Sequence, residues 1–308
     1  VTKPGYDASV LRLDNGKFLS IKIDGNPKQC YINPREGAIG CFEEACRNVV
    51  CTGAKPIGML DHLQFGNPTD PEIFWTFLES LKGLTDFAKD FEIPCVGGKV
   101  SLYNETSDGP IKPTPVIGVI GLIDKKPLKI QKINSGDSLI MIGDTKDELG
   151  GSEYAEYIHK FIGGKCPTVN FSESKKNMTS VLDIIENELI KSAHDCSKGG
   201  LTIAISELCM MNQIGCNVSL EKIPGEKLDS DKILFSESHS RYLVTFENRN
   251  LEKLEEILKK HNVSYSLIGE FTGDSILFSS DSKSIIDLSV DKAQKTWFNS
   301  LKEMVLHA

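Results

Sequence analysis

The sequence has no long apolar run and no closely spaced pair of cysteines. No stretch approaches the roughly 20 apolar residues of a membrane-spanning helix, and no basic-then-apolar leader opens the chain, so we expect no association with a membrane. The nine cysteines include no C-x-x-C pair, and the spacing of Cys41, Cys46 and Cys51 matches no zinc motif. Buried free thiols are the better interpretation, and they favour a reducing, cytoplasmic location.

An excess of basic residues is also missing. The formal net charge is -8, with 35 Lys and Arg residues against 43 Asp and Glu residues. A sequence-independent nucleic-acid binder needs a basic surface to neutralise phosphates, so we expect no nucleic-acid partner. Small anionic ligands stay compatible with this composition, because helix N-termini or metal ions hold them locally.

The familiar catalytic motifs are absent as well. The chain contains no P-loop, no H-E-x-x-H and no G-x-S-x-G motif, and its six histidines lie in unrelated contexts. The residues therefore offer no recognisable nucleophile–base pair. The chain begins with Val1, in the middle of a pattern, so we expect a fragment or a processed product.

Strand and helix periodicities interleave, which predicts an α/β (or α+β) protein with two layers in each part. The polar segment 124–136 is the expected boundary between domains 1–130 and 131–308. In the first domain we expect strands at 17–23, 56–60, 94–103 and 115–123, and helices that begin at 34 and 71. In the second we expect strands at 138–142, 241–247, 263–269 and 275–279, and helices near 175–191, 199–212, 250–261 and 289–306.

Acidic residues follow two of these strands, and a polar pair shares one helix face. Asp24 and Asp61 come directly after apolar strands, where side chains reach a crevice at the sheet edge, although a solvated turn Asp is the commoner role. Glu44 and Asn48 lie four residues apart and therefore on one helix face, which for such a pair is usually a hydrated surface. Together with Asp24, they could complete the oxygen shell of a Mg²⁺ ion.

Glycine-rich turns are candidate phosphate sites. Gly150-Gly151 and Gly199-Gly200 each precede an apolar-periodic stretch. Paired glycines before a helix let anions approach its N-terminal N–H groups, although helix entry or close packing explains such glycines more often. Ahead of the second turn, Asp195 offers an anionic ligand and Ser197 an N-cap hydroxyl. The segment 97–101 combines a flexible turn, a cation and a hydroxyl; it is either a phosphate site or a β-bulge with an exposed lysine.

Eight longer segments carry a family resemblance and together cover about residues 4 to 245. In chain order they are PGYDASVLRL, DGNPKQCYINPREGA, EEACRNVVCTGAKPIGMLDHLQFGNP, VGGKVSLYNET, IKPTPVIGVIGLI, ELGGSEY, SAHDCSKGGL and FSESHSRYLV. The chain resembles the second half of the formylglycinamide ribonucleotide amidotransferase (phosphoribosylformylglycinamidine synthase) family, in the aminoimidazole ribonucleotide synthetase-like superfamily. SLYNET and PTPVIG favour that enzyme over a stand-alone relative with another acyl or phosphoryl acceptor.

The resemblance implies a fold, a reaction and partners. The fold would be a two-part unit, with an N-terminal α/β part whose strands join a barrel with a twin unit and a C-terminal sheet flanked by helices. The reaction would convert formylglycinamide ribonucleotide, ATP and glutamine-derived ammonia into formylglycinamidine ribonucleotide, ADP and phosphate in purine synthesis. ATP or ADP and Mg²⁺ would be the cofactors. The partners would be the N-terminal half, a glutaminase subunit and a small accessory subunit.

The same resemblance assigns roles to residues. Asp61 and Gly98 match contacts to the active-site ATP, and Ser101 matches a substrate contact. Ser197 matches a nucleotide contact at an auxiliary site that holds a structural ADP. The Mg²⁺ ligands of that auxiliary site correspond to Asp24, Glu44, Asn48 and Asp195.

The resemblance implies that the catalytic histidine belongs to the half that this chain lacks, so no residue here fills that role. We therefore expect the chain alone to be inactive. The alternative is a catalytically silent nucleotide–magnesium module that scaffolds the catalytic half.

Three positions depart from the family pattern. Lys99 stands where the family usually has an Asn that ligates Mg²⁺, and an ammonium group cannot ligate a cation. Either Lys99 brings its own charge to the phosphates, or this copy of the site binds metal differently. Gln64 stands where an Asn is usual, and His239 where a Gln is common.

Overall fold

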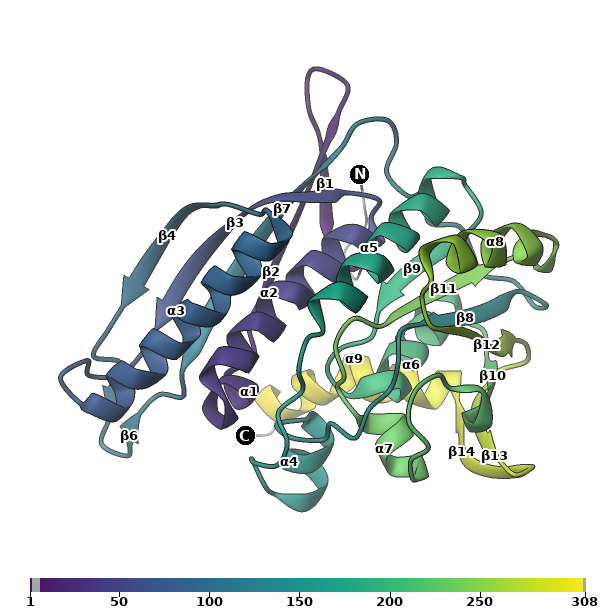
Figure 1. The fold of residues 1–308 in the computed structure, drawn as a ribbon. Helices are drawn as coiled ribbons and strands as arrows, with labels where there is room; N and C mark the ends of the chain where they lie inside the picture. Colours follow the sequence, from purple (N-terminus) through teal and green to yellow (C-terminus); the bar gives the residue numbers. More distant parts are fainter. Residues whose placement is uncertain (2–5, 307–308) are drawn as a thin grey trace.

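The chain forms two β-sheets with helices between and around them (Figure 1). The computed structural model describes Val1 and residues 6–306, so Pro4 and Gly5 of the first motif and His307 lie outside the described residues. Within these residues, no helix is both long and apolar enough to cross a bilayer.

The first sheet has five strands in the order β1-β2-β7-β3-β4, with β3 and β4 parallel and the other neighbours antiparallel. Its strands are β1 (Ser9–Arg12), β2 (Phe18–Asp24), β7 (Thr114–Ile123), β3 (Lys55–Gln64) and β4 (Cys95–Ser101). A short hairpin of β5 (Glu105–Thr106) and β6 (Gly109–Pro110) follows β4. The helices of this part are α1 (Pro27–Ile32), α2 (Pro34–Cys51) and α3 (Pro71–Phe91).

Capping residues define where the two long helices of this part begin. Asn33 caps α2 and Asp70 caps α3, each through a side-chain oxygen that accepts backbone N–H groups of the first turn. A proline follows each cap at the first helical position, where its missing N–H costs no intrahelical bond. Gly83 lets the two helices approach closely, because a Cβ there would lie 2.4 Å from the Arg35 carbonyl oxygen.

The second sheet has seven strands in the order β14-β13-β10-β12-β8-β11-β9. These strands are β8 (Ser138–Ile142), β9 (Ser192–Asp195), β10 (Cys216–Ser219), β11 (Tyr242–Phe246), β12 (Tyr265–Phe271), β13 (Ser275–Ser280) and β14 (Lys283–Ser289). The helices are α4 (Glu153–His159), α5 (Phe171–Glu186), α6 (Gly200–Asn212), α7 (Ser230–Phe235), α8 (Leu251–His261) and α9 (Val290–Leu306), with 3-10 turns η1 (Leu220–Lys222) and η2 (Asn248–Asn250).

The centre of the second sheet is buried on both faces. In β8, Ile140 and Ile142 join the core that includes α2, α5 and α8, while Leu139 and Met141 join a second core with α6 and α7. This double burial explains why the sequence there is a continuous apolar run rather than an alternation. The sheet flanked by helices is therefore as predicted.

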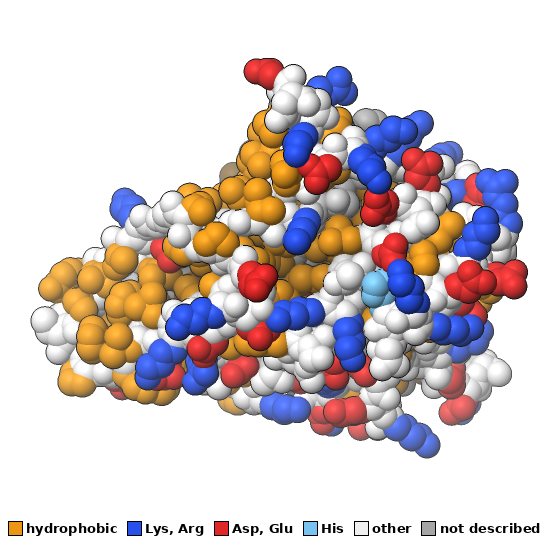
Figure 2. Space-filling view, turned by 45° about the horizontal axis from the view of Figure 1, so that its top comes forward, with side chains coloured by type: hydrophobic (Ala, Val, Ile, Leu, Met, Phe, Trp, Pro, Cys, Tyr) orange, Lys and Arg blue, Asp and Glu red, His pale blue; other side chains and the backbone are white. Residues whose placement is uncertain are grey.

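The first sheet, in contrast, is covered on one face. Ser20 of β2 and Met59 of β3 are buried beneath the helices, while Ile23, Ile57 and Leu60 are 66%, 41% and 42% exposed. Figure 2 shows hydrophobic side chains gathered at the end of the molecule where β3 and β4 lie in Figure 1. Among the described residues no helix covers this side of the sheet, here called the uncovered face.

Most predicted elements exist, with shifted ends. The strand predicted at 56–60 runs on to Gln64, so Asp61 lies inside β3 and the expectation that it follows the strand was wrong. Asp24 is the last residue of β2. The helix predicted from 175 begins at Phe171 and ends at Glu186. The predictions missed nine helices and strands: α1, α4, α7, β1, β5, β6, β9, β10 and β14.

We predict that the aromatic contact between α2, α3 and α5 contributes strongly to stability. Phe87 has no exposed surface, and its ring lies 4.7 Å from that of Phe42, 3.9 Å from Phe91 and 5.5 Å from Phe171. Phe87→Ala should lower the free energy of unfolding by about 3–5 kcal/mol in urea titrations, because it leaves a cavity. Phe74→Ala, at a ring that is 44% exposed, is the control. Equal effects of the two changes would contradict the prediction.

Candidate functional site

One register row of the first sheet carries three of the predicted site positions. Asp24 of β2 and Asp61 of β3 both pair with Ile117 of β7, and Asp61 also pairs with Gly98 of β4. Directly paired residues of neighbouring strands point to the same face, and Ile117 is fully buried beneath the helices. Asp24 and Asp61 therefore lie on the helix-covered face, two strands apart.

Asp24 meets acidic groups from α2 and from the end of β9. Asp24, Glu44 and Asp195 form a group that we call the carboxylate cluster; Glu44 is 6% exposed and Asp195 4%. Burial raises the pKa of Glu44, and the neighbouring charges of Asp24 and Asp195 help to raise it well above its usual range. A buried carboxyl group beside two others is stabilised by a proton or a bound cation.

Asn48 lies next to this cluster on the following turn of α2. Its Nδ2 donates a hydrogen bond to the Glu44 carbonyl oxygen at 2.9 Å, and its Oδ1 accepts one from the Lys22 Nζ at 3.0 Å. The structure thus places Asp24, Glu44, Asn48 and Asp195, the four residues to which the resemblance assigns Mg²⁺, in one neighbourhood. Among the described residues, the ligand atoms of the three carboxyl groups do not all lie within 4.8 Å of one another. Carboxylate and amide oxygens are the ligands that Mg²⁺ prefers, so the donor set fits such an ion.

A buried ion pair lies behind the cluster. Arg47 has no exposed surface, forms an ion pair with Glu43 one turn earlier in α2, and places Nη2 3.4 Å from Asp195 Oδ2. The hydroxyls of Ser174 and Ser240 donate to Glu43 Oε1 at 2.9 and 3.0 Å. Because Glu43 is held by three donors, its geometry fixes Arg47, and Arg47 in turn orients the Asp195 carboxylate.

His239, a departure from the family pattern, belongs to the same buried region. Its Nδ1 lies 3.4 Å from Arg47 Nη1. Burial and the charge of Arg47 lower the pKa of His239 well below its usual range, so the ring is neutral. Gln64, another departure, is the last residue of β3 and pairs with Ser101.

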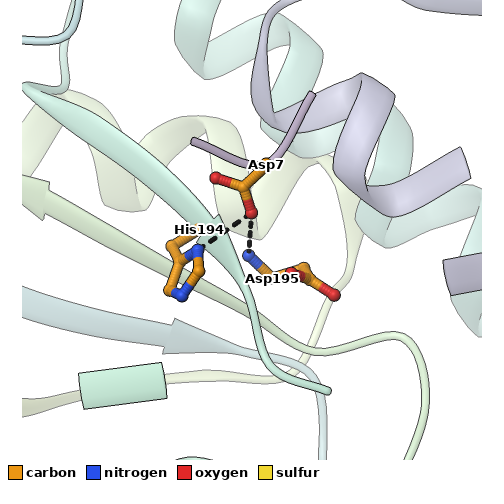
Figure 3. A group of neighbouring side chains, drawn as sticks. All are labelled: Asp7, His194 and Asp195. Carbon is orange, nitrogen blue, oxygen red and sulfur yellow. Dashed lines mark hydrogen bonds and ion pairs between the residues drawn. The ribbon is translucent and has the colours of Figure 1, made fainter. Parts of the chain in front are cut away.

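A second group, which no sequence pattern indicated, lies beside Asp195 (Figure 3). The ligand atoms of Asp7, His194 and Asp195 lie within 4.8 Å of one another. Asp7 Oδ1 accepts the Asp195 backbone N–H at 2.9 Å and lies 2.9 Å from His194 Nδ1, while His194 Nε2 lies 3.0 Å from Glu207 Oε2. Burial alone would lower the pKa of His194, but these carboxylates raise it well above its usual range.

Both ring nitrogens of His194 are therefore engaged by carboxylates. An imidazolium ion clamped in this way ties the N-terminal segment to β9 and α6 and neutralises part of the acidic region. The group acts as an ion-pair clamp, because no ring nitrogen is free to bind a metal.

The two glycine turns meet at an internal carboxylate. Glu237 Oε1 accepts the backbone N–H of Gly199, the N-cap of α6, and of Glu153, the first residue of α4, each at 2.8 Å. Glu237 thereby occupies the N–H donors that the sequence suggested for phosphate. Ser197 does not cap α6, as its pattern had suggested, because Gly199 holds that position without a side-chain bond.

The turn around Ser197 nevertheless lies beside the end of β2. Lys198 Nζ donates a hydrogen bond to the Gly25 carbonyl oxygen at 3.1 Å, and Gly25 follows Asp24 directly. The backbone N–H of Gly200 bonds to the Ser197 carbonyl oxygen at 3.0 Å. The turn is thus held close to the carboxylate cluster.

Asp61 and Gly98 form a second contact, at the other side of β7. A Cβ on Gly98 would lie 2.1 Å from Asp61 Oδ1, so only glycine leaves room for this carboxylate. The backbone N–H of Lys99 also bonds to the Asp61 carboxylate. Strand alternation sends the side chains of Lys99 and Ser101 to the uncovered face, where Ser101 Oγ donates to Asn104 Oδ1 at 3.2 Å. The structure therefore joins Asp61 to Gly98 but not to the side chains of Lys99 and Ser101.

A cavity of about 620 Å³ lies elsewhere, between the segment 124–131 and α5. Its lining includes Lys55, Leu122, Leu182 and Glu186 but none of the predicted site residues. The carboxylate cluster therefore does not line this cavity.

Two family models match consecutive parts of the chain. Residues 5–123 match "AIR synthase related protein, N-terminal domain", and residues 134–281 match "AIR synthase related protein, C-terminal domain". The chain belongs to the AIR synthase related family. The first range holds β1 to β7, and the second runs from the segment before β8 to just after β13, so the two matches follow the two sheets of this AIR synthase related chain apart from β14.

Curated relatives share the name phosphoribosylformylglycinamidine synthase subunit PurL. The Alkaliphilus metalliredigens protein is 38% identical over 305 residues, which are 98% of this chain and 41% of the relative. The Methanocaldococcus jannaschii protein is 39% identical over 315 residues, which cover 99% and 42%. This AIR synthase related chain therefore spans about two fifths of the length of these relatives.

Solved structures agree on the fold. Thermotoga maritima PurL complexed with FGAR matches with a TM-score of 0.82 at 20% identity, over 94% of this chain and 48% of that one. The same protein complexed with ATP gives 0.78 at 20% identity, over 93% and 46%. The structure of PurLQS from that organism gives 0.77 at 20% identity, over 94% and 47%.

We predict that Glu237 makes the stability of the chain depend on pH. Burial raises the pKa of Glu237 from 4.5 to about 7 despite its two N–H bonds. A carboxyl group whose pKa is higher in the folded state than in the unfolded state stabilises the fold fully below its unfolded pKa. This stabilisation is lost as the pH rises through the pKa of the folded state. The loss amounts to about 3 kcal/mol between about pH 4.5 and 7.

The measurement is the free energy of unfolding in urea at several pH values. Glu237→Gln keeps an oxygen acceptor for both N–H groups but cannot ionise, so its stability should lack this decline. Glu256→Gln, at an exposed position of α8, should keep the decline of the parent chain. Parallel pH curves for the parent chain and Glu237→Gln would refute the assignment.

Proposed function

We propose that this chain is the second synthetase unit of a phosphoribosylformylglycinamidine synthase. Its two domains match the family in order, and PurL relatives are 38–39% identical over nearly all of it. The order of its motifs resembles the second half of that enzyme. We place the division between its domains near residue 130, and its unpaired thiols support a reducing, cytoplasmic setting.

The proposed enzyme makes formylglycinamidine ribonucleotide in purine synthesis. ATP phosphorylates the amide oxygen of formylglycinamide ribonucleotide, which turns a poor leaving group into a good one, and ammonia then displaces phosphate. Charge that develops on the transferred phosphoryl group is stabilised by cations and N–H donors.

The carboxylate cluster is the observation that carries this proposal. Asp24, Glu44 and Asp195, with the Asn48 amide, collect hard oxygen ligands at the junction of the two sheets, and the raised pKa of Glu44 reflects negative charge that a cation would offset. We assign Mg²⁺ to these four residues and a nucleotide phosphate, ADP or ATP, to the neighbouring Ser197 turn. Bound there, Mg²⁺ would neutralise phosphate charge.

We assign the edge of the active ATP site to Asp61 and Gly98, and a substrate contact to Ser101. The Lys99 side chain points away from the Asp61 carboxylate, and only the backbone N–H of Lys99 bonds to that carboxylate. Of the two roles open to Lys99, this favours a site that binds metal differently from the family pattern over one that places the lysine charge beside Asp61.

The uncovered face supports a protein partner. Exposed Ile23, Ile57, Leu60 and Val96 lie on one sheet, and such apolar patches mark interfaces. We propose that the N-terminal half of the synthase covers this face and closes a barrel with it. A glutaminase subunit and a small accessory subunit complete the proposed assembly, which the structure named PurLQS supports.

We predict that the chain alone does not turn over substrate, because the catalytic histidine belongs to the other half. With formylglycinamide ribonucleotide, ATP, Mg²⁺ and an ammonium salt, ADP release should stay at the level of the blank. Full-length Alkaliphilus metalliredigens PurL serves as the positive control in the same assay. Substrate-dependent ADP release by this chain would overturn the half-enzyme proposal.

A second candidate function is a silent module that binds a nucleotide and scaffolds the catalytic half. The position of the cluster within the core shared by both sheets favours it, because a ligand there stabilises the fold. Both functions predict binding, but only the first predicts that Asp61→Asn lowers turnover of the assembled enzyme while nucleotide binding at the cluster is unchanged.

We predict that Mg·ADP raises the melting temperature through Glu44. A ligand at 100 times its Kd adds about 2.7 kcal/mol of stability, and Glu44→Gln should lose most of this gain. In EDTA the same variant should be at least as stable as the parent, because it relieves repulsion with Asp24 and Asp195. Asp90→Asn, which removes an exposed carboxylate, should keep the gain. The assignment fails if Glu44→Gln responds to Mg·ADP like the parent chain.

A further inference from the structure

Lys22 places a positive charge beside the carboxylate cluster from the same strand as Asp24. Side chains alternate along β2, so Lys22 shares the helix-covered face with Ser20 and Asp24. It pairs in register with Val119, which is fully buried. The lysine stem thus runs over the core, and Lys22 is partly buried.

The ammonium group bonds to a neutral oxygen rather than to a carboxylate. Its Nζ lies 3.0 Å from Asn48 Oδ1, and within the described part of the chain no carboxylate oxygen lies within ion-pair distance of it. Burial raises the pKa of Asp195, and the Lys22 charge is one of those that oppose this rise. Lys22 therefore lies close enough to act on the cluster electrostatically while its hydrogen bond goes to Asn48.

The amide of Asn48 can serve one cation at a time. Its Nδ2 is fixed by the Glu44 carbonyl oxygen at 2.9 Å, so Oδ1 is the atom left for a ligand role. A divalent ion and an ammonium group on the same oxygen would repel each other strongly in this half-buried region. The two occupants therefore exclude each other.

We propose that Lys22 is a built-in competitor for the cation site of this chain. The Lys22 ammonium holds the Asn48 oxygen when no metal is bound, and it must leave that oxygen before Asp24, Glu44, Asn48 and Asp195 can share a divalent ion. The inference rests on the proposed function, which assigns the ion to these four residues.

Two consequences follow from the exchange. Without metal, the Lys22 ammonium group supplies positive charge beside the carboxylate cluster, so the fold does not require the ion. Metal affinity is lowered by the free energy of displacing the ammonium group, which makes occupancy of the site depend on the free concentration of the metal and its nucleotide.

The test measures Mn²⁺ binding without nucleotide, by electron paramagnetic resonance of free Mn²⁺ and by calorimetry. Lys22→Met keeps the stem and removes the charge, and it should bind Mn²⁺ at least tenfold more tightly than the parent chain. Lys17→Met, which removes a charge from an exposed pair with Asp124, should change the affinity by less than twofold. Equal affinities of Lys22→Met and the parent chain would overturn the proposal.

A double-mutant cycle separates competition for Asn48 from a general effect of charge. If Lys22 competes for the amide oxygen, its removal should bring much less gain in the Asn48→Ala background than in the parent chain. An equal gain in both backgrounds would overturn the competition, because only long-range repulsion would then act. Lys22→Gln is a second neutral variant that replaces Lys22→Met if the latter folds poorly. It should also bind Mn²⁺ more tightly than the parent chain.

Failure of the inference and failure of the proposed function give different results. If the parent chain and Lys22→Met bind Mn²⁺ equally and Glu44→Gln abolishes binding in both, the cation site stands and the role of Lys22 falls. If neither protein binds Mn²⁺, the proposed cation site itself is wrong, and the inference falls with it.

Discussion

The structure depends on one constraint: α2 is buried along almost its whole length, yet it carries Glu43, Glu44, Arg47 and Asn48. Buried charges are stable only when they are paired and hydrogen-bonded. Glu43 and Arg47 largely satisfy each other, but the Glu44 carboxylate and the Asn48 oxygen need partners from other elements. Lys22 of β2 binds the Asn48 oxygen, and Arg47 reaches Asp195 at the end of β9, so the polar groups of one helix contact both sheets. The Glu44 carboxyl group meets the acidic groups Asp24 and Asp195 instead, which help to raise its pKa.

Sequence periodicity predicts the parts of this arrangement that are local. The spacing of Glu44 and Asn48 places them on one helix face whatever the helix packs against, and the apolar run 138–142 predicts the strand that the structure shows as β8. The family resemblance adds the domain order, which the AIR synthase related matches confirm. Cys41, Cys46 and Cys51 are buried free thiols, as their spacing indicated. Each of these signals lies within a few residues of the feature that it predicts.

The missed features depend on residues that are far apart in the chain. Asp7 and His194 are 187 positions apart, and the Glu237 carboxylate reaches N–H groups 38 and 84 positions away. No local pattern marks such contacts, because the side chains meet only after the sheets pack.

The position of Asp61 was predicted wrongly for a related reason. The polar residues after the apolar run 56–60 continue β3, since their backbone groups pair with β4 and β7 on either side.

The two sheets differ in how much apolar surface each can bury within the chain. The second sheet has helices on both sides, whereas the first leaves Leu60 and its neighbours to water, a cost that grows with the exposed area. Asp61 and Gly98 face the helices, while the Ser101 and Lys99 side chains belong to the uncovered face. If a second unit closes over that face, as proposed, it hides the apolar residues and completes the surroundings of Ser101 in the same step. Assembly and substrate binding would then be coupled through β4, because its alternate residues belong to the two different environments.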